Sequence, residues 1–371
     1  MAKIRKVVST VWYNKENYHR LRNVFPQSEF VYVDFFDKER LEKEAADADV
    51  AILLGDVESC LLGSKSLKWI ACDHAGLNGS ARPEVFASGI TVTGAAGRSA
   101  PVLAEHCIYF MLQACYHTKE LLKAQETCTW GVEGSASWKG LYGRNAAILG
   151  MGNNGRMLCE RLHAFGMNLY LYDKYPIRGY DYAAEKCIET EGGKVDDILS
   201  ECDFIILTLP LTDETYHMFD AERFSKVKKG AAFINMARGG VVSTADLIEA
   251  LNNDTLSFAG LDVVEEQPLP ADSPLWKMDK VYITPHVTPQ VPDRAARSIE
   301  IIRENARRFE ADKPMKNVLR QEDASTKDGE GGWAKLLNAT PELIKDVPKA
   351  MLEEYLGKKD WEDPTEWNYV D

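Results

Sequence analysis

The sequence predicts an α/β protein made of two doubly wound domains, each with a mostly parallel sheet covered by helices. The chain of 371 residues is longer than one hydrophobic core usually serves, so two domains are expected. Short apolar runs alternate with polar, helix-like stretches twice along the chain, first near the N-terminus and again from Asn145 to His286. Strands joined by helices in this rhythm pair in parallel.

The first series contains five strand-like apolar runs, each followed by a charged or small-residue segment. Behind them, Ser99 suits an N-cap and Pro101 stands in the first turn of a long helix. This helix is expected over residues 102–125 and is long enough to bridge two domains. The five predicted strands lie within residues 6–12, 30–36, 50–55, 67–73 and 90–94.

The second series is clearer, and one long loop is expected in it, between Asp173 and Phe204. Residues 293–311 have an amphipathic pattern, which predicts a helix that returns to the first domain. Residues 322–332 are typical of a flexible linker, and the tail beyond them is expected to dock through its tryptophans, Trp333, Trp361 and Trp367. The predicted strands lie within residues 145–150, 168–173, 204–210, 231–237, 257–264 and 280–286.

Composition and charge exclude several classes of protein. The net charge is −13, and residues 321–371 alone hold thirteen acidic and six basic residues. This balance argues against nucleic acid as a partner, because phosphate binding needs clustered Lys and Arg. The sequence has no apolar run of about 18 residues and no charged-then-apolar leader, so neither a membrane span nor a secretory signal is expected. The eight cysteines form no C-x-x-C pair, which favours free thiols in the cytoplasm and no metal site.

A G-x-G-x-x-G motif, Gly150 to Gly155, follows the first strand of the second series and opens a helix. In that context it predicts a dinucleotide site. Gly150 suits a tight turn, Gly152 lets the backbone approach a pyrophosphate, and Gly155 allows close helix packing. The backbone N–H groups of Asn153 and Asn154, at the helix start, then face the phosphates.

An acidic residue closes the next strand, about 20 residues after the motif, at Asp173. Its carboxylate is expected to accept bonds from the adenosine ribose hydroxyls and to repel a 2′-phosphate. The cofactor expected on this ground is NAD rather than NADP, although Lys174 could soften the discrimination.

Three later strands of the same series also end in polar residues, namely Arg238, Asp262 with Gln267, and His286. In a doubly wound sheet these residues open on the same crevice as the dinucleotide. An Arg suits a substrate carboxylate through its planar fork of donors, and a His suits proton exchange through its near-neutral pKa. The pattern therefore predicts hydride transfer to or from a 2-oxo or 2-hydroxy acid.

Seven segments, together with their order along the chain, make the sequence resemble the D-2-hydroxyacid dehydrogenase family from about residue 45 to residue 320. The resemblance implies an NAD-dependent oxidoreductase that interconverts a 2-oxo acid and its D-2-hydroxy acid. The segments are KWIACDHAGLN, VLAEH, GMGNNGRM, LTLPLTDETYHMF, NMARGGVV, LDVVEEQPLPADSPLW and ITPH.

The resemblance also implies the domain arrangement. A Rossmann cofactor domain, residues 101–290, is inserted into a smaller flavodoxin-like substrate domain formed by residues 1–100 and 291–321. Residues 322–371 form an acidic C-terminal extension. A homodimer built partly on the long helix from Pro101 is implied as well.

By the same resemblance, the backbone N–H groups of Ala75 and Gly76 bind the substrate carboxylate. Arg238 holds the carboxylate and the carbonyl, and His286 gives a proton to the carbonyl oxygen. The residues implied to lie around the cofactor are Leu209, Pro210, Thr215, Ala237 and Asp262.

The family usually has a Glu at the position of Gln267, whose charge raises the pKa of the catalytic His. Three alternatives stay open. In the first, Gln267 pairs with His286 and leaves it easier to deprotonate. In the second, Glu265 or Glu266 is the charged partner of His286. In the third, the chemistry is lost and the chain senses NAD or binds a partner.

The family's formate dehydrogenases carry Gln in this role, so a formate-dehydrogenase-like enzyme is the closest enzymatic alternative. Against it, Ser99 stands where those enzymes have an Asn, and Thr288 with its neighbours replaces their Ser-Gly pair. Arg98 is interpreted as a solvated charge, with selection of a second anionic group as its alternative role.

Overall fold

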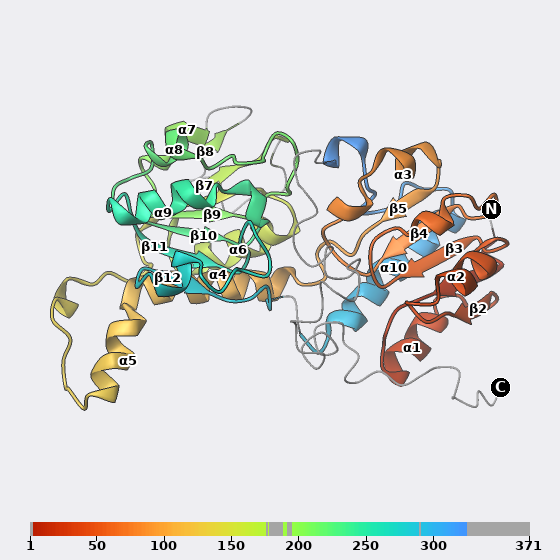
Figure 1. The fold of residues 1–371 in the computed structure, drawn as a ribbon, viewed down its shortest axis with the longest axis horizontal. Coiled ribbons are helices and arrows are strands. Elements are labelled where there is room, and N and C mark those ends of the chain that lie inside the picture. Colours follow the sequence, from red (N-terminus) through yellow and green to blue (C-terminus); the bar gives the residue numbers. More distant parts are fainter. Residues whose placement is uncertain (1–2, 176, 178–187, 191–194, 289–290, 325–371) are drawn as a thin grey trace. The chain divides into compact units, whose positions relative to one another are not determined.

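The computed structural model describes residues 3–175, 177, 188–190, 195–288 and 291–324. The chain divides into two compact units, one running from Ser99 to Pro289 and the other formed by the segments on either side of it. Each unit contains its own sheet (Figure 1).

The outer segments build a five-stranded parallel sheet in the order β2-β1-β3-β4-β5, which is the flavodoxin-like order. Its central strands are buried along their whole length, as expected for a parallel sheet covered on both faces. The strands are β1 (Lys6–Ser9), β2 (Glu29–Tyr32), β3 (Val50–Leu53), β4 (Trp69–Cys72) and β5 (Thr91–Thr93), and the helices are α1 (Lys15–Arg22), α2 (Lys38–Ala45), α3 (Pro83–Ala87) and α10 (Arg294–Glu310), with short 3-10 turns η1 (Ser59–Leu61), η2 (Asn78–Ser80) and η6 (Gln321–Asp323).

Helix α10 belongs to this unit although it follows the whole of the other one. Its apolar side chains at Ile299, Ile302 and Ala306 recur at helical spacing and share a core with Val7 and Trp69. The face that they form explains why the chain returns to this sheet.

The unit from Ser99 to Pro289 has a seven-stranded parallel sheet in the order β12-β11-β10-β9-β6-β7-β8. Counted from its first strand, β6, this is the Rossmann order with one added edge strand. The strands are β6 (Asn145–Leu149), β7 (Asn168–Tyr172), β8 (Ile188–Thr190), β9 (Phe204–Leu207), β10 (Ala231–Asn235), β11 (Leu256–Leu261) and β12 (Val281–Ile283), and the helices are α4 (Ala100–Tyr116), α5 (Thr118–Glu126), α6 (Asn153–Ala164), α7 (Val195–Leu199), α8 (Ala221–Phe224) and α9 (Thr244–Asn252), with 3-10 turns η3 (Ser135–Ser137), η4 (Gly239–Val241) and η5 (Pro274–Lys277).

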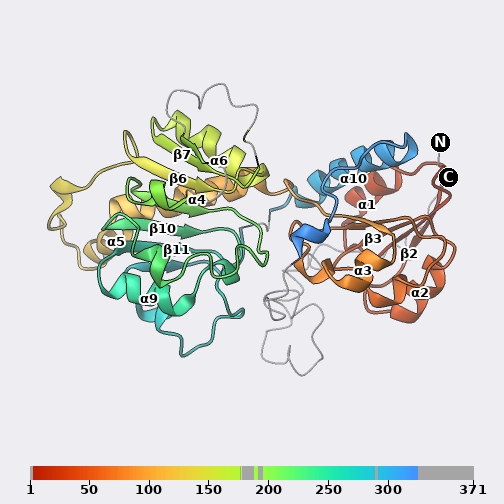
Figure 2. The same cartoon turned by 90° about the horizontal axis from the view of Figure 1, so that it is seen from above.

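Two cores cover the two faces of this sheet. Figure 2 shows α4 and α6 on one face and α9 on the other, and the buried residues of these helices fall into two separate clusters. The predicted fold class, two doubly wound parallel α/β sheets, is confirmed.

Two local predictions were wrong. The segment expected to be a loop contains β8 and α7, which are too short to give a sequence pattern; β8 is defined by its pairing with β7. The predicted helix over residues 102–125 breaks at His117, whose φ of 44° is left-handed and whose ring stacks on Trp138.

Helix α4 therefore does not bridge two domains, and it lies wholly within one unit. The chain turns into α5 where the backbone N–H of Lys119 donates to the Tyr282 hydroxyl at 2.9 Å and its Nζ donates to the carbonyls of Asp279 and Val281. No residue of α5 is buried. Among the described residues, no helix is long and apolar enough to cross a membrane.

Candidate active site

The glycine-rich loop between β6 and α6 is tight at its ends and open in its middle. A Cβ on Gly150, whose φ is 104°, would lie 2.9 Å from the backbone N of Leu209, and one on Gly155 would lie 2.0 Å from the carbonyl oxygen of Gly150. A Cβ on Gly152 would meet no atom within 4 Å. Space is therefore left only beside the second glycine, and Asn153 and Asn154 begin a helix there with N–H groups that lack helical partners. This geometry fits a dinucleotide pyrophosphate.

Asp173 follows β7 and is hydrogen-bonded to the glycine-rich loop. Its Oδ2 accepts from the backbone N–H of Met151 at 2.7 Å, and its Oδ1 accepts from that of Tyr175 at 3.0 Å. A carboxylate oxygen has a second acceptor site, so Asp173 can hold the loop and still accept from a ligand hydroxyl. Lys174 is the next residue in the sequence, and its Nζ lies 3.5 Å from Glu214 Oε2. This ion pair partly offsets the positive charge beside Asp173.

The loops after β9 and β10 stand at the same end of the sheet. Leu209 and Ala237 are buried, and Pro210 is exposed. The hydroxyl of Thr215 donates to the Pro210 carbonyl at 2.7 Å and accepts from the backbone N–H of Thr212 at 2.8 Å. Thr215 thus stabilises its own loop, whichever ligand the loop covers.

Arg238 is the N-cap of η4, three residues after the end of β10, and its Nη1 donates to the Ala237 carbonyl at 2.7 Å. The next residue must be glycine, because a Cβ on Gly239 would lie 1.9 Å from the carbonyl oxygen of Val264. The β10 loop therefore packs directly on the β11 loop, which carries Gln267.

Gln267 contacts His286, which was the first of the three alternatives left open by the sequence. The Gln267 Oε1 lies 3.1 Å from the His286 Nδ1, and the Gln267 Nε2 donates to the Val264 carbonyl at 3.1 Å. A backbone carbonyl only accepts, so it orients the amide with its oxygen toward the imidazole. The His286 Nδ1 is then the N–H donor, and its Nε2 is the nitrogen that can exchange a proton with a ligand.

The surroundings of His286 favour the uncharged ring. Burial and the positive charge of Arg238 lower the pKa of His286 to about 4, although Asp262 acts in the opposite direction. Gln267 supplies no charge to offset these effects. At neutral pH the imidazole is neutral, with a lone pair on Nε2.

Comparison with known proteins decides the family. A model described as "D-isomer specific 2-hydroxyacid dehydrogenase, NAD binding domain" matches residues 108–288. A glyoxylate reductase of Korarchaeum cryptofilum (strain OPF8) is 30% identical over 284 residues, which cover 74% of this chain and 83% of that relative. The chain belongs to the D-isomer specific 2-hydroxyacid dehydrogenase family. It is an oxidoreductase that interconverts 2-oxo acids and 2-hydroxy acids.

Two further relatives support the assignment of this chain to the family. A glyoxylate/hydroxypyruvate reductase B of Shigella dysenteriae serotype 1 (strain Sd197) is 38% identical over 187 residues, which cover 50% of this chain and 57% of that relative. The structure of a D-isomer specific 2-hydroxyacid dehydrogenase from Xanthobacter autotrophicus Py2, in complex with NADPH and MES, matches with a TM-score of 0.72 and 25% identity, covering 86% of this chain and 99% of that one. The resemblance inferred from the motifs is confirmed.

In this dehydrogenase the nearby acids do not take the place of Gln267. The carboxylate of Glu265 accepts from the His217 ring at 2.5 Å and from the backbone N–H of Thr244 at 3.0 Å, and Glu266 is exposed. Burial opposes ionisation, but the Thr244 N–H and the His217 ring lower the pKa of Glu265 below its ordinary value. The Glu265 charge is thus already paired, away from His286.

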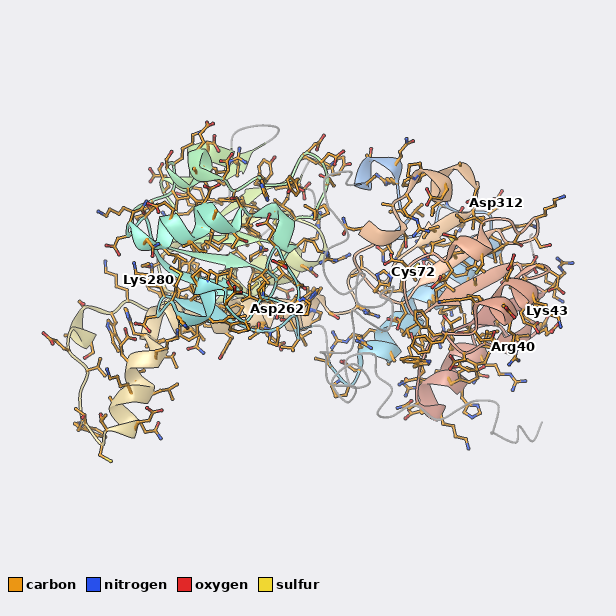
Figure 3. The ribbon with its side chains drawn as sticks, viewed as in Figure 1. Arg40, Lys43, Cys72, Asp262, Lys280 and Asp312 are labelled. Carbon is orange, nitrogen blue, oxygen red and sulfur yellow. The ribbon has the colours of Figure 1, made fainter. Side chains whose placement is uncertain are left out.

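No role was predicted for His106 or Thr284, and Thr288 was noted as a difference from the formate dehydrogenases. Thr284 contacts the buried Asp262, which Figure 3 labels. Thr284 Oγ1 donates to Asp262 Oδ1 at 2.7 Å, and His106 contacts the hydroxyls of both threonines. Their only sequence signals were the His that ends VLAEH and the threonines around the Pro-His pair.

The residues predicted to bind the substrate carboxylate lie in the other unit, in the loop after β4. Ala75 is exposed, and the Gly76 carbonyl accepts from His74 Nδ1 at 2.7 Å. Arg98 is not a solvated charge: it is only 7% exposed and donates to Asp73 Oδ1 at 2.8 Å and to Ser298 Oγ at 3.2 Å. That interpretation failed because the buried Asp73 acts as its counter-ion, which spacing alone does not reveal.

Proposed function

We propose that this dehydrogenase reduces a small 2-oxo acid to its D-2-hydroxy acid with NADH, and catalyses the reverse oxidation with NAD. The observation that carries the proposal is the contact between Gln267 and His286 in the same sheet end as Arg238 and the open glycine-rich loop. Glyoxylate and hydroxypyruvate are the first substrates to test, because the relatives described above are named as their reductases.

Five residues of this chain take part in the proposed reaction. Arg238 binds the substrate carboxylate and polarises the carbonyl, which its planar fork of donors suits. Gln267 fixes the tautomer of His286, so that Nε2 gives the proton to the carbonyl oxygen during reduction and takes it back during oxidation. Ala75 and Gly76 supply backbone N–H groups to the carboxylate. When bound, the nicotinamide supplies or accepts the hydride at C2 of the substrate.

The low pKa of His286 has a consequence for direction. Reduction needs the protonated ring, and at neutral pH without substrate the ring is neutral. A bound substrate carboxylate offsets the charge of Arg238 and so raises the pKa of His286. Oxidation of the 2-hydroxy acid needs the neutral ring, which is already present.

NADH is preferred over NADPH in this proposal, on the strength of Asp173. Its carboxylate lies beside the glycine-rich loop and repels a 2′-phosphate. The cofactor is held by the backbone of Gly150, Gly152, Asn153, Asn154 and Gly155, with Leu209, Pro210, Thr215, Ala237 and Asp262 around it. The Xanthobacter structure contains NADPH, so the ratio of kcat/KM values for NADH and NADPH is a necessary measurement.

A homodimer is the assembly that the exposed apolar surface supports. Helix α5 projects from its unit (Figure 1), and Leu121 and Leu122 on it are 42% and 53% exposed. Trp130, in the segment that follows, is fully exposed. Apolar surface of this kind is typical of a protein interface, and a second copy of the chain is the partner proposed here. The described cysteines are free thiols, which supports the cytoplasm as the compartment.

The test is a panel of 2-oxo acids, including glyoxylate and hydroxypyruvate, with NADH and with NADPH. The proposal expects saturable oxidation of NADH and a D-configured product from any chiral substrate.

Formate is assayed in parallel with NAD, because an uncharged Gln267 beside His286 also suits hydride transfer without proton exchange. Reduction of NAD by formate, with no turnover of 2-oxo acids, would replace the proposal by a formate-dehydrogenase-like activity. Cofactor binding with neither activity would indicate an NAD-sensing protein.

A further inference from the structure

We infer that His106 is a positioning residue that holds both ends of the segment carrying His286. The inference rests on the proposed function, in which His286 exchanges the substrate proton. His106 lies on α4, and its two ring nitrogens contact the hydroxyls of Thr284 and Thr288, which stand two residues before and two residues after His286. One imidazole therefore contacts both flanks of the proposed acid–base residue.

The hydrogen bonds have a defined direction. The carboxylate of Asp262 accepts at 2.7 Å from Thr284 Oγ1, which must donate because a carboxylate has no proton to give. The Thr284 oxygen is then left to accept from the N–H at His106 Nε2, 3.4 Å away. The other nitrogen, His106 Nδ1, carries the lone pair and accepts from the Thr288 hydroxyl. The chain of donors runs from Thr288 through His106 and Thr284 to Asp262.

A neutral imidazole fits this chain, since it has one donor and one acceptor nitrogen. Burial lowers the pKa of His106, although the charge of Asp262 acts against this. Thr288 and Asp262 are themselves 7% and 3% exposed, so water competes little for these bonds.

The ring of His106 is anchored to the rigid part of the unit. It stacks on Phe110, with ring centroids 4.7 Å apart, and Phe110 is fully buried. Phe110 in turn packs so closely on β11 that a Cβ on Gly260 would lie 2.6 Å from its Cγ. Through His106, the segment 284–288 is therefore held in place relative to α4 and the sheet.

This segment needs to be held. His286 has a φ of 53°, a left-handed conformation that costs free energy for a residue other than glycine. Its backbone N–H donates to the Asp262 carbonyl at 2.9 Å, and that of Val287 donates to Asp262 Oδ1 at 3.3 Å. His106 holds the same segment through hydrogen bonds to the side chains of Thr284 and Thr288.

The test compares His106→Phe, which keeps the ring stacked on Phe110, with Thr288→Val and Thr288→Ser. His163→Phe is the matched control, because His163 is an exposed histidine of the same unit. We expect His106→Phe and Thr288→Val to lower kcat by about 10- to 100-fold with little change in the KM for NADH, as for other residues that orient a functional His. Thr288→Ser restores kcat to within about threefold, since it keeps the hydroxyl.

Hydrogen exchange of the backbone amides of Thr284 and residues 286–288 gives a readout that does not depend on turnover. His106→Phe and Thr288→Val should speed exchange of His286 and Val287, and His163→Phe should not. The inference is overturned if exchange is unchanged, if exchange rises without loss of kcat, or if Thr288→Ser is as impaired as Thr288→Val. A wild-type enzyme inactive on every 2-oxo acid would instead refute the proposed function, and the exchange data would still decide whether His106 holds this segment.

Discussion

Replacement of Gln267 by Glu tests how the charge state of His286 is set. The Gln267 Oε1 stands 3.1 Å from His286 Nδ1, so the Gln267→Glu variant places a carboxylate oxygen at the same point without changing the length of the side chain. The substitution adds the charge that the family usually has there. We expect it to raise the pKa of His286.

The size of the effect follows from the geometry. Two opposite charges centred about 4 Å apart attract by about 4 kcal/mol at an effective dielectric constant of about 20. At about 1.4 kcal/mol for each unit of pKa, this is an upper bound of about 3 units, and desolvation of the new carboxylate reduces it. From its present pKa of about 4, His286 should therefore move up by about 1 to 3 units.

The assay is the pH profile of kcat/KM for 2-oxo acid reduction at saturating reduced cofactor. Reduction needs the protonated ring, so a raised pKa shifts the limb where activity falls with rising pH to higher pH by the same amount. Gln27→Glu is the matched control, since it makes the same substitution at an exposed position in the other unit. An unmoved limb in Gln267→Glu, or an equal shift in the control, would refute the assignment of Gln267 as the residue that sets the charge of His286.

Three further predictions concern the cofactor and the assembly. Asp173→Ser removes the carboxylate beside the glycine-rich loop, so the ratio of kcat/KM for NADH to that for NADPH should fall by at least about tenfold, which steady-state kinetics with both cofactors measures. Gly155→Ala puts a Cβ 2.0 Å from the Gly150 carbonyl oxygen, so α6 must shift. Calorimetric titration should then show NADH binding weakened by about tenfold or more. Wild-type affinity would show that the close packing of α6 on the loop is not needed for binding. Leu121→Glu combined with Leu122→Glu places charges on the exposed face of α5, so the protein should sediment as a monomer in sedimentation velocity. An intact dimer would show that the interface does not include this face.

The fold could be predicted because parallel strands buried on both faces appear as short apolar runs, and every such run became a strand. The errors lie where stability comes from contacts distant in sequence. The break at His117 depends on Trp138 and Tyr282, which no local pattern at residues 102–125 indicates. Strand β8 exists through its pairing with β7.

The candidate site shows the same division. The presence of Gln267 and His286 at one end of the sheet could be predicted, because both follow neighbouring parallel strands, β11 and β12, at their carboxyl ends. Their contact was one of three alternatives that the resemblance to the family left open. The role inferred for His106 could not be predicted, since it comes from a helix that precedes these strands by more than a hundred residues. The burial of Arg98 was missed for a related reason, because its partner Asp73 acts only once the loops of the first sheet come together.

The variant His286→Asn tests most directly whether His286 exchanges the proton while Arg238 binds the substrate. The variant keeps a small polar side chain and removes the titrating group. We predict that kcat for reduction of the best 2-oxo acid falls by about 10²- to 10⁴-fold, while NADH binding, followed by the fluorescence of the reduced nicotinamide, stays within about threefold of wild type. Turnover of 2-oxo acids by His286→Asn at close to the wild-type rate would show that His286 does not exchange the proton.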